Sequence, residues 1–155
     1  MRTAIAFLLV VSFAALLVGC GAPSANEERM LMELLTDQTS YGPGEPVRMS
    51  LVITNTTRQP VTYEFSSSQH YDFWAVRDRR EIWRWSHDKS FVQIPTSLTL
   101  NPGESKVFAE TWNRLDNDDL PAPNGTYAIM GQLTTMDVRP DPVSKTITIG
   151  VNVGG

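Results

Sequence analysis

The sequence is poor in the residues on which most metal and catalytic sites depend. Its 155 residues include one cysteine and two histidines, which excludes an intramolecular disulfide framework and a cysteine-rich zinc site. It also lacks an excess of basic residues, because 13 Lys and Arg stand against 17 Asp and Glu and the formal net charge is −4. This balance gives no electrostatic reason to expect a nucleic acid as a partner.

Catalytic motifs are missing as well. The sequence has no glycine-rich phosphate loop, no nucleophile elbow and no pair of carboxylates at a spacing that would indicate acid–base catalysis. His70 and His87 lie outside any ligand motif, and we expect both to be solvated loop residues. The acidic run at 116–119 lacks the central glycine and terminal glutamate of a calcium-binding loop. We therefore expect no catalysis, no cofactor, no metal and no small-molecule substrate.

One long apolar run is present, at the N-terminus. Residues 4–18 are apolar except for Ser12, and the run ends at Gly19 and Cys20. It is shorter than the ~20 residues of a membrane-spanning helix and is typical of a secretion signal. The order Leu-Val-Gly-Cys at 17–20 resembles the lipobox of bacterial lipoproteins, which implies cleavage before Cys20 and acylation of that residue.

These features give a prediction for the first 29 residues. We expect a lipoprotein signal peptide at 1–19 and a lipidated tether at 20–29, whose small and polar residues suit a flexible spacer. The lipid on Cys20 would attach the chain to a membrane. The expected location is the cell envelope, outside the cytoplasm.

Beyond the tether, apolar and polar residues alternate with the period of two that is typical of half-buried strands. At 47–55 the apolar positions are Val47, Met49, Leu51 and Ile53. Shorter alternating segments occur at 61–65, 71–75, 83–85, 107–108, 127–131 and 143–151, with turn signals rich in Gly, Pro and Asn between them. The pattern predicts one all-β domain over 30–153, an antiparallel β-sandwich of about seven or eight short strands. Residues 26–35 fit either a helix or the first strand.

The aromatic residues are expected to divide between core and surface. Alternation puts Tyr71 and Phe73 on one face of their strand and Trp74 on the other, where it either packs beneath a loop or meets a partner such as a protein or a sugar. Trp83 and Trp85 share a face, and their bulk suits the centre of the core. Arg84 points the other way and either stacks on Trp74 or lies free on the surface. The predicted core aromatics are Tyr71, Phe73, Trp83, Trp85, Trp112 and Tyr127.

Several strings of residues occur together in one order. They include Tyr-Gly-Pro-Gly-Glu-Pro-Val at 41–47, Trp-Arg-Trp-Ser at 83–86, Asn-Pro-Gly-Glu-Ser at 101–105 and Asn-Gly-Thr-Tyr at 124–127. In this order they resemble the BsuPI-type intracellular proteinase inhibitor family over nearly the whole domain. The resemblance implies an immunoglobulin-like β-sandwich in which 30–35 is a strand, and inhibition of a subtilisin-like serine protease.

The chain departs from the family pattern in two places. It carries an export signal where the named inhibitor acts inside the cell, and Asp-Arg-Arg-Glu at 78–81 replaces the usual glycine-containing turn. Our first hypothesis is a lipid-anchored inhibitor that fills a protease cleft with an exposed loop, either 77–81 or 86–95. The second is an envelope interaction or assembly module without inhibitory activity. The candidate contact residues are Trp74, Arg79, Arg80, Arg84 and Phe91, of which Phe91 either enters an apolar pocket of the protease or plugs the core.

Overall fold

The computed structural model describes residues 30–136 and 139–150, and the expected signal peptide and tether lie outside them. The described residues form strands, turns and loops, and they contain no helix that would cross a bilayer. The strands are β1 (Leu31–Thr36), β2 (Ser40–Tyr41), β3 (Val47–Thr54), β4 (Val61–Phe65), β5 (Tyr71–Arg77), β6 (Arg80–Arg84), β7 (Thr96–Leu100), β8 (Ser105–Trp112), β9 (Gly125–Leu133) and β10 (Val143–Ile149).

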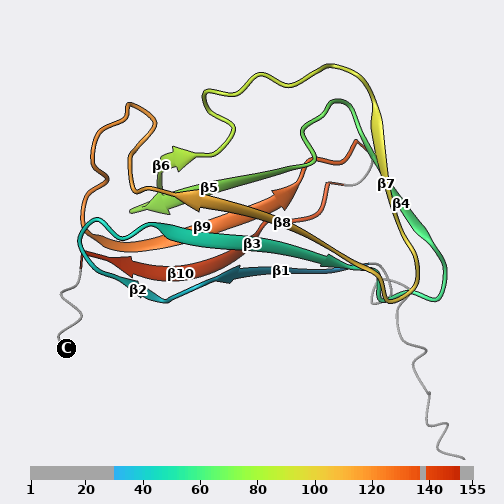
Figure 1. The fold of residues 1–155 in the computed structure, drawn as a ribbon, viewed down its shortest axis with the longest axis horizontal. Helices are drawn as coiled ribbons and strands as arrows, with labels where there is room; N and C mark the ends of the chain where they lie inside the picture. Colours follow the sequence, from blue (N-terminus) through green and yellow to red (C-terminus); the bar gives the residue numbers. More distant parts are fainter. Residues whose placement is uncertain (1–29, 137–138, 151–155) are drawn as a thin grey trace, which may run out of the picture.

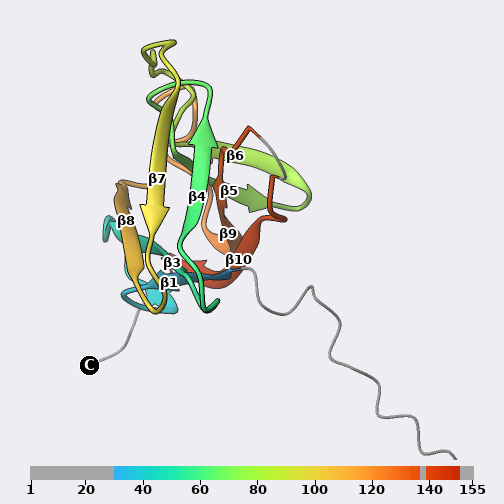
Figure 2. The ribbon, with the colours of Figure 1, turned by 90° about the vertical axis from the view of Figure 1, so that its right-hand side faces the viewer.

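Two sheets pack face to face as a sandwich (Figures 1 and 2). One has three strands in the order β1-β3-β8, and the other has five in the order β2-β10-β9-β5-β6. Neighbouring strands are antiparallel except β2 and β10, which run parallel. Figure 2 shows the three-stranded sheet on the left and the larger sheet on the right. The predicted all-β antiparallel sandwich is confirmed, and β1 occupies the segment that the resemblance implied to be a strand.

Strands β4 and β7 pair antiparallel as a separate two-stranded sheet at one end of the sandwich (Figure 1). Sequence patterns missed β7, because its apolar positions are only Leu98 and Leu100 among Thr and Ser. They also missed β2, which has only two residues and lies beside a string of turn residues. The described chain therefore has ten strands rather than seven or eight.

The core lies between the two main sheets. On β3, Val47, Met49, Leu51 and Ile53 are buried and point toward the larger sheet, so the alternation read from the sequence is the one observed. Gly131 of β9 faces Leu51, and a Cβ at position 131 would lie 3.2 Å from the Leu51 Cδ1 atom. Any larger residue there would press against Leu51, so this glycine sets how closely the sheets pack.

Candidate functional site

Three of the six predicted core aromatics are buried: Phe73, Trp112 and Tyr127. The other three, Tyr71, Trp83 and Trp85, are half-buried and pack against the core from its margin. Trp83 and Trp85 lie there rather than at the centre, because β6 is the edge strand of its sheet and Trp85 directly follows it.

Stacked aromatic rings close the gap between the sheets beside edge strands β6 and β8. Tyr71 stacks on both Trp85 and Phe108, with 4.6 Å between ring centroids in each pair. Trp83 stacks on Trp112 at 5.7 Å. The segment that follows β6 is thereby held against β8, on the other sheet.

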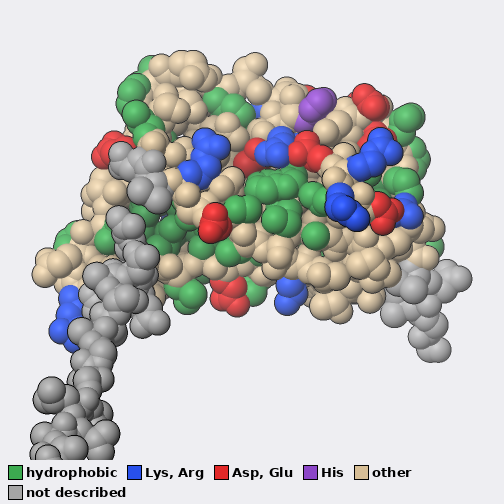
Figure 3. Space-filling view, turned by 180° about the vertical axis from the view of Figure 1, so that it is seen from behind, with side chains coloured by type: hydrophobic (Ala, Val, Ile, Leu, Met, Phe, Trp, Pro, Cys, Tyr) green, Lys and Arg blue, Asp and Glu red, His purple; other side chains and the backbone are tan. Residues whose placement is uncertain are grey.

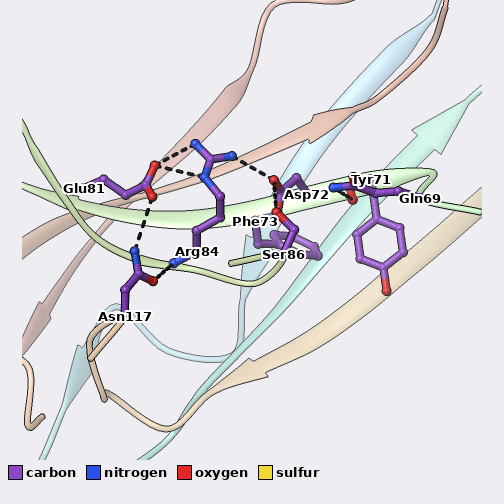
Figure 4. A network of polar contacts seen from close by, with 8 residues as sticks. All are labelled: Gln69, Tyr71, Asp72, Phe73, Glu81, Arg84, Ser86 and Asn117. Carbon is purple, nitrogen blue, oxygen red and sulfur yellow. Dashed lines mark hydrogen bonds and ion pairs between the residues drawn. The ribbon is translucent and has the colours of Figure 1, made fainter. Parts of the chain in front are cut away.

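A network of polar contacts fixes Arg84 over the outer face of β5 (Figure 4). The buried Asp72 carboxylate accepts hydrogen bonds from Arg84 Nη1 and from Ser86 Oγ, each at 2.7 Å. Glu81 Oε2 accepts two more from Arg84, at 2.6 Å and 3.0 Å. The hydrogen bond from Arg84 to Glu81 and the contact with Asp72 raise the pKa of the guanidinium, although burial opposes them. Arg84 therefore stays charged and is committed to partners within the chain.

Arg84 also covers Trp74. Its Cζ atom lies 4.7 Å from the centroid of the half-buried Trp74 ring, so the two predicted contact residues meet as a cation–π pair. The strand register puts Met130 beside Trp74 and Ala128 beside Val76 on the same outer face. Figure 3 shows this face, where hydrophobic side chains gather at the centre with charged side chains around them.

The acidic run at 116–119 closes the edge of β6. Asn117 Oδ1 accepts a hydrogen bond from the Arg84 amide at 2.8 Å, and the Asn117 amide donates to the Ile82 carbonyl at 3.1 Å. Asp116 Oδ1 accepts from the amides of Asp118 and Leu120. Among the described residues, no group of three His, Cys, Asp or Glu is placed to hold a metal ion.

The turn between β5 and β6 carries two of the predicted contact residues, Arg79 and Arg80, both exposed. Arg77 pairs with Arg80 across it, and Asp78 and Arg79 have φ of 49° and 64°. Two central residues with positive φ make a type I′ hairpin turn, in which glycine is usual. This chain therefore adopts a turn that favours glycine although neither of its two central residues is glycine.

The loop at 86–95 is exposed, but contacts with nearby segments of the same chain hold it in place. In the middle of the loop, Phe91 packs on Trp85 with 5.7 Å between ring centroids. Ser68 binds both backbone groups of Val92. The Ser68 amide donates to the Val92 carbonyl at 2.9 Å, and the Ser68 Oγ accepts from the Val92 amide at 3.0 Å. At the far end, Thr96 Oγ1 donates to the Ser67 carbonyl at 3.1 Å.

Between these anchors the loop presents apolar side chains to solvent. Val92 and Ile94 are 60% and 62% exposed. Sequence reasoning left Phe91 open as either a contact residue of this loop or a plug in the core, and in the structure Phe91 is half-buried against Trp85. It missed Ser68, because a serine that holds a segment more than twenty residues away leaves no local pattern.

His70 is part of the loop's support. Contrary to the expectation of a solvated residue, its ring is half-buried and stacks on Phe65 at 4.2 Å, and its Nε2 lies 2.8 Å from Thr96 Oγ1. Burial lowers the pKa of His70, and the positive charge of Lys106 lowers it further. His87, in contrast, is exposed as expected.

A groove of about 260 Å³ lies between the start of this loop and β8. Trp83 and Trp85 line it from the larger sheet, and Glu110 and Thr111 line it from β8. The loops at 88–89 and 113–119 complete its rim.

Replacing Arg84 with Ala is expected to lower the free energy of unfolding by about 1–3 kcal/mol, because the buried Asp72 carboxylate loses its charged partner. Arg80→Ala, which removes an exposed arginine from the same strand, should change it by less than about 0.5 kcal/mol. Urea denaturation of both variants measures the difference. Equal losses would show that the Asp72 contact does not stabilise the fold.

Acidification is expected to destabilise the protein through His70. Burial holds the pKa of His70 below its usual value. As pH falls below about 6.5, His70 is therefore protonated in the unfolded chain while it stays neutral in the folded chain. The free energy of unfolding should therefore drop between about pH 7 and about pH 5, and His70→Gln should make this drop smaller. His87→Gln is the matched control and should keep the full drop. Urea denaturation at each pH tests this, and an unchanged drop in His70→Gln would contradict it.

Solved structures with a similar fold have little sequence in common with this chain. The sporulation control protein Spo0M from Bacillus subtilis is 18% identical with a TM-score of 0.49, over 80% of this chain and 50% of that chain. The CARDB domain of the PF1109 protein from Pyrococcus furiosus, solved with di-metal ions, is 12% identical with a TM-score of 0.44, over 79% and 94%. This chain thus spans half the length of Spo0M. Similarities at this level carry no argument about activity. No curated protein matches the chain.

A family model named BsuPI and described as "Intracellular proteinase inhibitor" matches residues 34–138. This description names inhibition rather than catalysis, and it implies a protease as partner. It contradicts the expected location in the cell envelope, and that expectation, drawn from the N-terminal run, is wrong. Because the match covers well over half of the sequence and confirms the resemblance read from its strings, the chain belongs to the BsuPI family of intracellular proteinase inhibitors.

Proposed function

We propose that the chain inhibits a serine protease of the subtilisin type by inserting residues 92–95 of its exposed loop into the protease cleft. The observation that supports this most directly is the pair of exposed apolar side chains, Val92 and Ile94, on a segment fixed at both ends. Proteins that block a cleft without chemistry need such a contact segment.

The fixed ends of the loop favour tight binding. Ordering a flexible loop on association costs free energy, and a loop already held in its bound shape avoids that cost. Here Ser68 fixes the backbone at Val92, and Ser67 with His70 fixes Thr96. Phe91 acts as an anchor, because its ring is packed on Trp85 and not presented to a partner.

The hairpin tip at 77–81 is a weaker candidate for the same role. Its two central residues have positive φ, so its backbone turns back on itself and does not run extended. Peptides bound by backbone pairing lie extended along their partner. Arg79 and Arg80 at this tip are therefore assigned no contact with the cleft, and neither are Trp74 and Arg84, which pair with each other.

The test is titration of several subtilisin-like proteases with the full chain and its variants. The unaltered chain should inhibit stoichiometrically and remain uncut. The double variant Val92→Lys, Ile94→Lys should lose at least about tenfold in inhibition, because charged side chains replace the apolar contacts. Val107→Lys, at a residue that is 53% exposed on β8, is the matched control and should inhibit normally.

Two results would contradict the proposal. The first is unchanged protease activity at high concentrations of the chain across the whole panel. The second is inhibition that the double variant retains, which would move the contact to another surface. Thermal melting of each variant shows that the domain remains folded.

We also propose that Cys20 carries lipid and attaches the chain to a membrane. The support is the order Leu-Val-Gly-Cys at 17–20 after an apolar run of fifteen positions interrupted once. Each buried CH₂ of an acyl chain contributes about 0.8 kcal/mol, and two chains give lasting attachment.

Mass spectrometry of the N-terminus tests this modification. The chain from the membrane fraction should begin at Cys20 with the added mass of acyl groups, and Cys20→Ser should leave the chain unmodified and release it from the membrane. An uncleaved, unmodified N-terminus in the membrane fraction would refute lipidation.

A further inference from the structure

Strand β8 has one edge without a partner strand. Among the described residues its backbone pairs only with β3. The Asn55 amide donates to the Glu104 carbonyl at 2.9 Å, just before the paired segment begins. Because the direction of backbone groups alternates along an antiparallel pair, the even-numbered residues of β8 bond to β3. The N–H and C=O groups of Val107, Ala109 and Thr111 therefore point away from β3.

The groove described above lies along the end of this free edge. Thr111, whose backbone groups point away from β3, and Glu110, whose carboxylate accepts a hydrogen bond from the Tyr71 hydroxyl at 2.6 Å, form one wall. The indoles of Trp83 and Trp85 form the opposite one. An added strand would lie beside β8 with its inward-facing side chains between Glu110 and the two indoles.

The charges around the groove select the chemistry of that strand. Four of the lining side chains are carboxylates, Asp88, Glu110, Asp116 and Asp119, and one is an ammonium, Lys89. The Lys89 Nζ atom lies 5.1 Å from the centroid of the Trp85 ring, so an indole of this groove already receives a cation. An excess of carboxylates beside indole faces complements a basic side chain and repels an acidic one.

We propose that this groove binds an extended peptide segment with a basic side chain, which adds as a strand to the free edge of β8. The backbone of the peptide pairs with the unpaired groups of Ala109 and Thr111, and its Arg or Lys enters the space between Glu110 and the indoles of Trp83 and Trp85. This surface is separate from the exposed residues 92–95, and the binding goes beyond the proposed inhibition.

The first experiment compares labelled hexapeptides by fluorescence anisotropy with the full chain. The probes are TVTRTV, its acidic counterpart TVTETV, and two forms of TVTRTV that are N-methylated at one or the other alternate set of amides. A strand uses the amides of one edge only. TVTRTV should therefore bind at least about tenfold more tightly than TVTETV, and one methylated form should lose binding while the other keeps it.

A pair of variants tests the edge itself. Thr111→Pro removes an N–H that points away from β3, so it should spare the sheet and weaken TVTRTV binding by at least about tenfold. Thr111→Ala keeps the N–H and should bind as the unaltered chain does. If thermal melting shows that the proline variant is unfolded, the two methylated peptides with the unaltered chain decide the question.

Three outcomes would overturn the proposal: equal affinity for the basic and acidic peptides, equal affinity for the two methylated forms, or no binding at all. Sedimentation measures in addition whether the chain self-associates and whether Thr111→Pro abolishes this association. If it does both, that result would overturn the proposal too, because the edge of β8 would then bind a second copy of the chain and not a peptide. Peptide binding should be unaffected by Val92→Lys, Ile94→Lys, so a failure of the inhibition proposal can be told apart from a failure of this one.

Discussion

The ion pair between buried Asp72 and Arg84 is the contact on which the arrangement of this molecule's exposed loops depends. On one side, the same carboxylate accepts the hydroxyl of Ser86, where the loop 86–95 begins. On the other, Arg84 and Glu81 meet Asn117, which holds the loop 113–124 against β6. Burying a carboxylate costs free energy unless charged and hydrogen-bonding partners surround it. The partners of Asp72 therefore hold the starts of these two loops close to one point of the sheet.

Both proposed contact surfaces lie on the side of the sandwich where β6 and β8 are edge strands of opposite sheets. No strand of the described chain bridges them there, and stacked rings of Tyr71, Trp85 and Phe108 fill the gap instead. Aromatic rings fill the volume between the sheets and keep water out of the core, but they do not pair with backbone groups. The outer edge of β8 therefore has no partner strand in the described part of the chain. The open side of the fold is thus also where the chain can meet partners.

The sequence alone was sufficient for the features that repeat locally. The alternation of Val47, Met49, Leu51 and Ile53 gave both the strand and the buried face, because one face of a sheet must be apolar over the core. The contacts of the candidate site could not be predicted from the sequence. Asp72 reads as a surface residue between Tyr71 and Phe73, and its burial depends on an arginine supplied by the next strand. His70 likewise depends on Phe65 and Thr96, which no period relates to it.

The anchors of the loop 86–95 also bear on what happens if a protease cuts it. A cleavage within 92–95 would produce a new carboxyl end still held at Val92 by Ser68 and a new amino end still held at Thr96 by Ser67. The two ends could not diffuse apart, and their effective concentration would stay high. Hydrolysis would then gain little entropy, and the severed bond would be readily resynthesised, so the loop would occupy a protease without being consumed by it.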